Sequence, residues 1–182
     1  MQSIPSPNSG QILLLVTPYV GGRDVFDLVA RLALQGNLEV VDGGNTFDAY
    51  HVVRALRRQT ADFSPAMERI RLARAFTCYQ MAALLADLEG SARPGVPLLA
   101  LDFLSTFADQ NVATAERRRL LKECLARLRR LSKVGPVGVW VRVRKVVPEE
   151  MGEFLGRIEH AAERTWRLDH LPPGGPLQLE LF

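Results

Sequence analysis

Apolar segments of strand length alternate with helical patterns along most of this chain. The segment Gln11–Val16 is almost continuously apolar, which is typical of a strand covered on both faces. From Asp24 to Leu34 the apolar residues recur every three or four positions, which predicts a helix. The alternation continues, and it predicts strands at 38–42, 70–76, 96–102, 137–145 and 164–169 and helices at 47–58, 77–88, 114–131 and 149–163.

Strict alternation of strands and helices predicts a parallel sheet with helices on both faces, which is a three-layer α/β/α fold. The chain has 182 residues, of which 47% are hydrophobic, enough for one substantial core. We expect residues 1–170 to form a single domain, with the Ser- and Pro-rich residues 1–9 disordered. The segment Leu171–Pro176 (LPPGGP) favours neither helix nor central strand, so residues 171–182 are predicted to be a spacer and a terminal peptide.

The composition narrows the classes of partner and cofactor. A formal net charge of +3 permits nucleic acid as a partner without demanding it. Cys78 and Cys124 form no C-x-x-C pair, and the histidines show no ligand spacing, so we expect neither a metal nor a cofactor. The chain shows no secretory signal and no apolar run of membrane-spanning length, which predicts a cytoplasmic protein without a membrane partner.

Three segments resemble the ATP-binding core of the RecA/RadA recombinases, in the same order and with similar spacing. RadA-type recombinases have a strand ending in D-T-E-G-T-F, a segment like A-R-A-[FY]-N-x-x-H-Q, and a strand ending in L-L-V-V-D-S before a helix rich in Arg and Leu. The corresponding segments here are VVDGGNTFDAYHV (40–52), IRLARAFTCYQMAALL (70–85), and PLLALDFLSTF with the following helix (97–131). The resemblance implies a RecA-like version of the α/β/α fold.

The phosphate-binding motif of that family is altered here. A P-loop reads G-x-x-x-x-G-K-[ST] between a strand and a helix, and the corresponding segment runs from Thr17 to Asp24. Thr17 replaces the first Gly, Arg23 the Lys and Asp24 the Ser or Thr, whereas Gly21 and Gly22 preserve a turn. A carboxylate at 24 puts negative charge at a helix N-terminus that would otherwise hold phosphate, and it can cap the helix in place of the anion.

Two further positions extend this pattern. The family's catalytic Glu falls on Gly44, which leaves no carboxylate there to orient the attacking water. Asp102 matches the metal-associated Asp of the fourth strand, and its structural alternative is a helix-capping or buried, hydrogen-bonded Asp. The Gln that closes the fifth strand of the recombinases corresponds approximately to Arg144. We therefore expect a pseudo-ATPase without catalytic residues, in which Gly21, Gly22, Arg23, Asp24 and Asp102 mark a vestigial nucleotide site.

The end of the fifth predicted strand is basic. Alternation places Arg142 and Arg144 on one face near the mouth of the sheet, and Lys145 follows them. These cations are candidates for weak, non-specific DNA binding through phosphate contacts. Ion pairing with nearby carboxylates such as Glu149 and Glu150 is the structural alternative.

The last five residues, QLELF, resemble the Q-L-[SD]-L-F peptide with which many bacterial replication and repair proteins bind the sliding clamp. The resemblance implies partner contacts through Gln178, Leu179, Leu181 and Phe182. The alternative is an additional edge strand, since the segment LQLELF alternates as a strand does.

These features predict a non-catalytic RecA-like accessory protein of DNA repair, recombination or damage-tolerant replication. Its expected protein partner is the sliding clamp, a recombinase or a polymerase. Two alternatives stay open: a weak or unconventional ATPase that uses Arg23 and Asp102, and a scaffold that binds a recombinase without contacting clamp or DNA.

Overall fold

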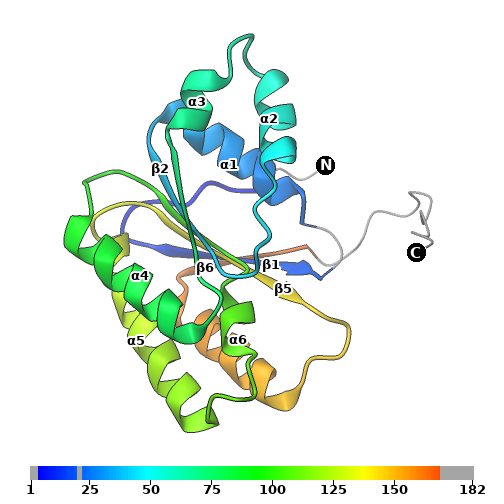
Figure 1. The fold of residues 1–182 in the computed structure, drawn as a ribbon, viewed down its shortest axis with the longest axis vertical. Helices are drawn as coiled ribbons and strands as arrows, with labels where there is room; N and C mark the ends of the chain where they lie inside the picture. The colour runs from blue at the N-terminus through cyan, green and yellow to red at the C-terminus, as the bar shows by residue number, and fades with distance from the viewer. Residues whose placement is uncertain (1–3, 20–21, 169–182) are drawn as a thin grey trace.

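The computed structural model describes residues 4–19 and 22–168, and it is a three-layer α/β/α fold (Figure 1). In this part of the chain the central sheet is wholly parallel, with strand order β3-β2-β4-β5-β1-β6. The strands are β1 (Ile12–Pro18), β2 (Leu38–Asp42), β3 (Ile70–Arg74), β4 (Leu98–Leu101), β5 (Val137–Val143) and β6 (Arg164–Arg167). The predicted fold class is confirmed.

The helices cover the two faces of the sheet in separate groups. One face carries α1 (Asp24–Gln35), α2 (Ala49–Arg57) and α3 (Ser64–Glu68), and the other carries α4 (Cys78–Ser91), α5 (Thr114–Ser132) and α6 (Glu149–Ala161) (Figure 1). A short 3-10 helix, η1 (Phe103–Phe107), follows β4.

Two hydrophobic clusters lie on either side of the sheet, and β1 contributes to both. Leu13 and Leu15 pack with α1, whereas Ile12, Leu14 and Val16 pack with α4, α5 and α6. All of these side chains are at most 2% exposed. Alternate residues of a strand point to opposite faces, so a strand covered on both sides needs an uninterrupted apolar run. This burial explains the apolar run in the sequence.

The observed element boundaries differ from the predicted ones by a few residues, for local reasons. The third strand ends at Arg74 instead of Phe76, because the Thr77 hydroxyl accepts a hydrogen bond from Gln80 N and begins α4. Similarly, Asp48 accepts a hydrogen bond from His51 N and begins α2. The short helices α3 and η1 were not predicted.

The N-terminal segment is described from residue 4 onward, and it packs against the domain. Ile4 is 3% exposed and belongs to the cluster beneath α1. Its carbonyl oxygen accepts a hydrogen bond of 2.5 Å from Arg31 Nη2. The spacer and the terminal peptide, including Gln178, Leu179, Leu181 and Phe182, lie outside the described residues.

Candidate functional site

The carboxyl ends of the parallel strands meet at one edge of the sheet, where ligands of such folds bind. A hollow of about 410 Å³ lies at this edge. Its lining includes Tyr19 after β1, Gly44 after β2, Asp102 after β4, and Arg142 and Arg144 at the end of β5. The structure therefore brings together Gly44, Asp102 and the two arginines, which the sequence analysis identified in three separate segments, and adds Tyr19.

The protein's own Trp140 lies against Thr17 and Gly22, the residues on either side of the undescribed positions in the segment that resembles a P-loop. Thr17 is fully buried, and its Oγ1 accepts a hydrogen bond of 2.9 Å from Trp140 Nε1. Gly22 has a φ of +80°, and a Cβ added there would lie 2.6 Å from Trp140 Cζ2 and 2.9 Å from Thr17 Oγ1. A glycine is thus needed at position 22 both for its backbone angle and for the close approach of the indole. The indole ring of Trp140 therefore occupies the space next to both Thr17 and Gly22.

The start of α1 shows how the other altered positions are used. Arg23 is the N-cap residue and Asp24 is the first helical residue, and no side chain caps the helix. The suggestion that Asp24 caps α1 is therefore wrong. Asp24 and Asp27 still place negative charge in the first turn, which favours the helix dipole and disfavours a bound anion. Gly21 lies outside the described residues.

Asp102 is a buried, ion-paired residue at the end of β4. It is 3% exposed, and its Oδ2 lies 2.5 Å from Arg142 Nη2. Its backbone is left-handed, with a φ of 44°, a conformation that Asp tolerates better than most residues. Of the alternatives left open for Asp102, this geometry matches a buried, hydrogen-bonded Asp.

The side chain of Asp102 occupies the space beside Gly44. A Cβ added at Gly44 would lie 2.0 Å from Asp102 Oδ2 and 2.7 Å from Asp102 Cγ. No carboxylate can therefore enter at position 44 unless Asp102 moves and breaks its contact with Arg142. The glycine at position 44 and the ion pair between Asp102 and Arg142 therefore depend on each other, because a side chain at 44 would displace the Asp102 carboxylate.

Asp42, which precedes this glycine, is fully buried and organises the loop between β2 and α2. Its Oδ1 accepts hydrogen bonds from Thr46 N at 2.9 Å and from Thr46 Oγ1 at 3.1 Å, and its Oδ2 accepts one from Phe47 N at 2.9 Å. Arg74 Nε lies 3.7 Å from the same carboxylate. Because these donors use both oxygens, Asp42 fixes the loop shape and serves as a structural residue.

Arg142 and Arg144, at the basic end of β5, both lie beside Tyr19 and line the hollow. The guanidinium carbons of these arginines lie 4.6 and 4.8 Å from the centre of the Tyr19 ring, within cation–π range. Arg142 also pairs with Asp102, which largely neutralises its charge. An ion pair was the alternative to DNA binding, but the carboxylate that Arg142 meets is Asp102 and not Glu149 or Glu150. Arg144 and Lys145 are exposed.

One buried cation in the hollow escaped the sequence analysis. Arg117 is 3% exposed, donates to the carbonyls of Val112 and Phe107 at 2.9 Å each, and pairs with Glu150 at 2.9 Å. In the sequence it belongs to a basic run on an amphipathic helix, which is usually a solvated face. Only its position opposite η1 and α6 shows that it holds the wall of the hollow together.

The hollow combines an apolar floor with charges that are mostly paired. Leu104, Met151 and Leu155 contribute apolar surface, whereas Glu150 and Arg142 are held in ion pairs. Within residues 4–19 and 22–168, no cluster of three or more His, Cys, Asp or Glu side chains is arranged to hold a metal ion.

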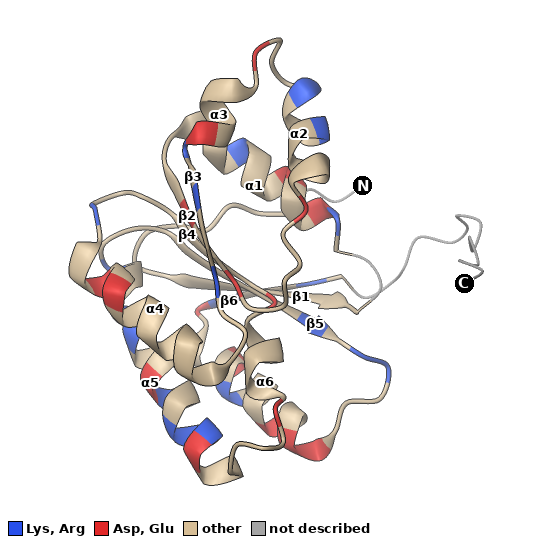
Figure 2. Cartoon of the chain, in the orientation of Figure 1, with Lys and Arg blue, Asp and Glu red and all other residues tan. Residues whose placement is uncertain are grey.

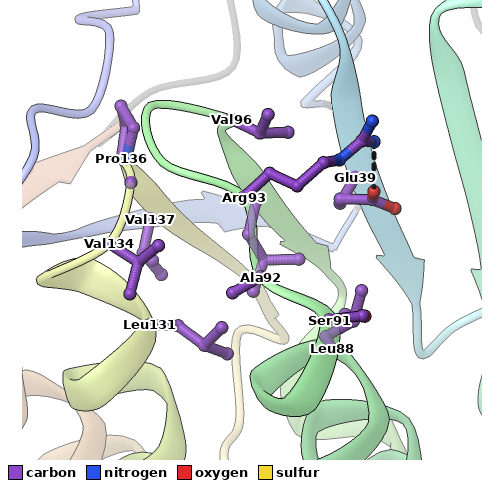
Figure 3. Close-up of a pocket in the computed structure, with 12 residues that line it drawn as sticks. Glu39, Leu88, Ser91, Ala92, Arg93, Val96, Leu131, Val134, Pro136 and Val137 are labelled. Carbon is purple, nitrogen blue, oxygen red and sulfur yellow. Dashed lines mark hydrogen bonds and ion pairs between the residues drawn. The ribbon is translucent and has the colours of Figure 1, made fainter.

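A second hollow lies at the opposite, amino edge of the sheet, and it is far smaller (Figure 3). Its volume is about 30 Å³, which is room for one or two water molecules. Glu39 lies at its rim and accepts hydrogen bonds from Arg71 at 3.1 Å and Arg93 at 3.4 Å. Its size excludes a nucleotide or peptide, so the carboxyl edge is the stronger candidate site.

Comparison with models of known protein families gives no match, and comparison with curated proteins gives none. In the part of the chain that the structure describes, no helix is both long enough and apolar enough to cross a membrane. The geometry of the carboxyl edge therefore carries the functional inference.

Proposed function

We propose that this chain is a non-catalytic, RecA-like accessory protein of DNA repair or damage-tolerant replication, which acts as a docking module. The observation that carries the proposal is the burial of Trp140 against Thr17 and Gly22, in the segment that would hold phosphates in a working P-loop. A phosphate and the indole cannot share that space.

The catalytic side of the site supports the same proposal. Gly44 offers no carboxylate, and Asp102 is engaged with Arg142 instead of facing an open metal position. Coordination of Mg·ATP by Asp102 would require this ion pair to break, and an Arg left partly buried without its partner is costly. ATP binding is thus opposed at the phosphate cradle and at the metal position.

Calorimetry with Mg·ATP tests this part of the proposal. We expect no heat of binding at micromolar nucleotide and no turnover above a blank without protein. As a control for an intact fold, the same sample should show one cooperative thermal transition. Specific turnover that is lost in an Asp102→Asn variant would overturn the proposal and favour the unconventional ATPase that uses Arg23 and Asp102.

The clamp contact rests on the sequence of the terminal peptide. Leu179, Leu181 and Phe182 would enter and cover an apolar pocket, and Gln178 would supply a polar anchor. Each buried Leu or Phe is worth about 1.5–3 kcal/mol, and ordering the peptide offsets much of this, so we expect an affinity of about micromolar.

Binding to a purified sliding clamp tests this contact by comparing the full chain with a Leu181→Ala/Phe182→Ala variant. The proposal predicts that the variant loses clamp binding and keeps the wild-type melting temperature. If the variant melts lower, the segment is an intrinsic strand of the fold; if it still binds the clamp, the peptide is not the contact.

A further inference from the structure

Helix α2 carries an exposed stripe of one aromatic and two basic side chains, formed by Tyr50, Arg54 and Arg57. Their spacing of four and three residues places them on one face of the helix. Tyr50 is 70% exposed, and both arginines are exposed. Among the described residues, no carboxylate lies within ion-pair distance of Arg54 or Arg57, although the Arg57 guanidinium lies 4.9 Å from the centre of the Phe63 ring.

The arginines of α5 behave differently, which makes the stripe on α2 unusual within this molecule. Arg118 pairs with Glu153 and Arg119 pairs with Glu116, at 2.6 and 2.8 Å. Hydrogen bonds from these arginines hold the pKa of both glutamates below the ordinary range. In Figure 2, blue and red segments alternate along α5, whereas α2 carries basic residues and no acidic ones. Most arginines of α5 are thus paired with glutamates of α4, α5 and α6, whereas Arg54 and Arg57 of α2 face solvent.

The surface beside the stripe is hollowed. Tyr50, Arg54 and Arg57 line a shallow depression of about 520 Å³ together with Val53 and Arg58. Arg58 pairs with Asp27 of α1 at 2.5 Å and so connects the end of α2 to α1. The charge of Arg54 and Arg57 is not compensated by this pair. The depression therefore combines a ring, an apolar floor and two free cations.

We propose that this stripe binds single-stranded nucleic acid, with Arg54 and Arg57 contacting phosphates and Tyr50 stacking on an unpaired base. Exposed aromatic rings flanked by cations are the elements with which proteins hold single strands without reading sequence. The ring of Tyr50 meets only His51 edge-on within the described residues, with 5.7 Å between centroids. This surface is separate from Arg142, Arg144 and Lys145, and the inference depends neither on the loss of ATPase activity nor on the clamp contact.

Fluorescence anisotropy with a labelled oligothymidylate of about 16 nucleotides tests the proposal, since single-strand sites span roughly 4–16 nucleotides. Arg54→Gln/Arg57→Gln should weaken binding at least about tenfold and reduce the slope of log K against log salt by about 1.4, which is the loss of two phosphate contacts to a single strand. Tyr50→Ala should weaken binding about fivefold or more, whereas Tyr50→Phe should retain it, because stacking needs the ring and not the hydroxyl.

The matched control is Arg118→Gln/Arg119→Gln, which removes the same charge from paired arginines on α5. It should leave affinity within about twofold of wild type, because an internally paired cation releases few counterions. All replaced side chains are exposed, so each variant should melt as wild type does, and thermal unfolding checks this.

Three results would overturn the proposal: no binding by the wild type at low salt, equal weakening in the α5 control, or unchanged binding in Tyr50→Ala. Binding of a duplex of the same length as tightly as the single strand would also overturn it, since paired bases are not free to stack on Tyr50. An oligouridylate of equal length tells whether RNA and DNA are bound alike. Clamp binding is measured separately, so failure here is distinct from failure of the proposed function.

Discussion

Replacing Gly44 by Ala directly tests whether the Asp102 side chain occupies the space that a side chain at position 44 would need. The three atoms nearest to the added Cβ all belong to Asp102, at 2.0, 2.7 and 2.8 Å. These distances are well inside van der Waals contact, so the carboxylate must move. It cannot move freely, because its Oδ2 is held 2.5 Å from Arg142 Nη2.

The expected cost follows from two contributions. Overfilling a well-packed site costs about 1–3 kcal/mol. Separating a fully buried ion pair costs about 3–5 kcal/mol, but the Arg142 side chain is 18% exposed, so only part of that cost applies. We expect Gly44→Ala to lower the free energy of unfolding by about 2–4 kcal/mol. For a chain of this size, that corresponds to a fall in melting temperature of roughly 4–16 °C.

A double-mutant cycle with Asp102→Gly isolates the contact. Glycine tolerates the φ of 44° at position 102 and removes the three atoms that lie nearest to the new Cβ. In that background Gly44→Ala should cost less than about 1 kcal/mol, so the coupling free energy should be about 1–4 kcal/mol. Urea denaturation with midpoint and slope measured for all four proteins provides these values.

Gly156→Ala is the matched control, because a Cβ there meets nothing within 4 Å and the residue lies inside α6. It should stabilise the protein by about 0.5–1 kcal/mol. The reasoning fails if Gly44→Ala unfolds at the wild-type midpoint. It also fails if the substitution is equally costly with and without the Asp102 side chain.

Three further predictions concern other parts of the fold. Thr17→Val leaves the buried Trp140 Nε1 without its acceptor and should cost about 1–3 kcal/mol in urea denaturation, and an unchanged midpoint would contradict the contact. Burial raises the pKa of Cys124 to about 12 and also raises the pKa of Cys78. Neither thiol should therefore react with Ellman's reagent near about pH 8 until the protein unfolds. Prompt reaction of the native protein would refute this. Hydrogen bonds from arginines of α5 lower the pKa of Glu89, so the stability that Glu89 contributes is present above the ordinary carboxyl pKa and is lost as pH falls. The melting temperature should therefore drop more on acidification in wild type than in Glu89→Gln. Equal drops in the two proteins would refute this.

The fold could be predicted because burial on both faces leaves a clear trace in the sequence. Strands such as β1 and β4 are buried along almost their whole length, so they appear as continuous apolar runs between amphipathic helices. Short elements leave no such trace. Helix α3 and η1 have five residues each, too few for an apolar period to be recognised.

The candidate site could be located from the sequence but its internal contacts could not. Gly44, Asp102 and Arg142 lie at the ends of predicted strands, so their meeting at the carboxyl edge was expected. The pairing of Thr17 with Trp140 joins residues 123 positions apart, and that of Asp102 with Arg142 joins residues 40 apart. Such contacts depend on strand order and register, which the apolar pattern does not encode. Trp140, which lies against Thr17 and Gly22, was therefore missed.

The residues of this site are mutually dependent, and this dependence strengthens the proposal that the site does not bind ATP. Gly22 makes room for the Trp140 indole, Gly44 makes room for Asp102, and Arg142 compensates the charge of Asp102. The two halves also touch, since the Arg142 guanidinium lies 5.7 Å from the centre of the Trp140 ring. Introducing a Glu at 44 would displace Asp102 and leave the indole against Thr17 and Gly22. A single substitution toward the recombinase motif is therefore expected to destabilise the fold without creating an ATPase.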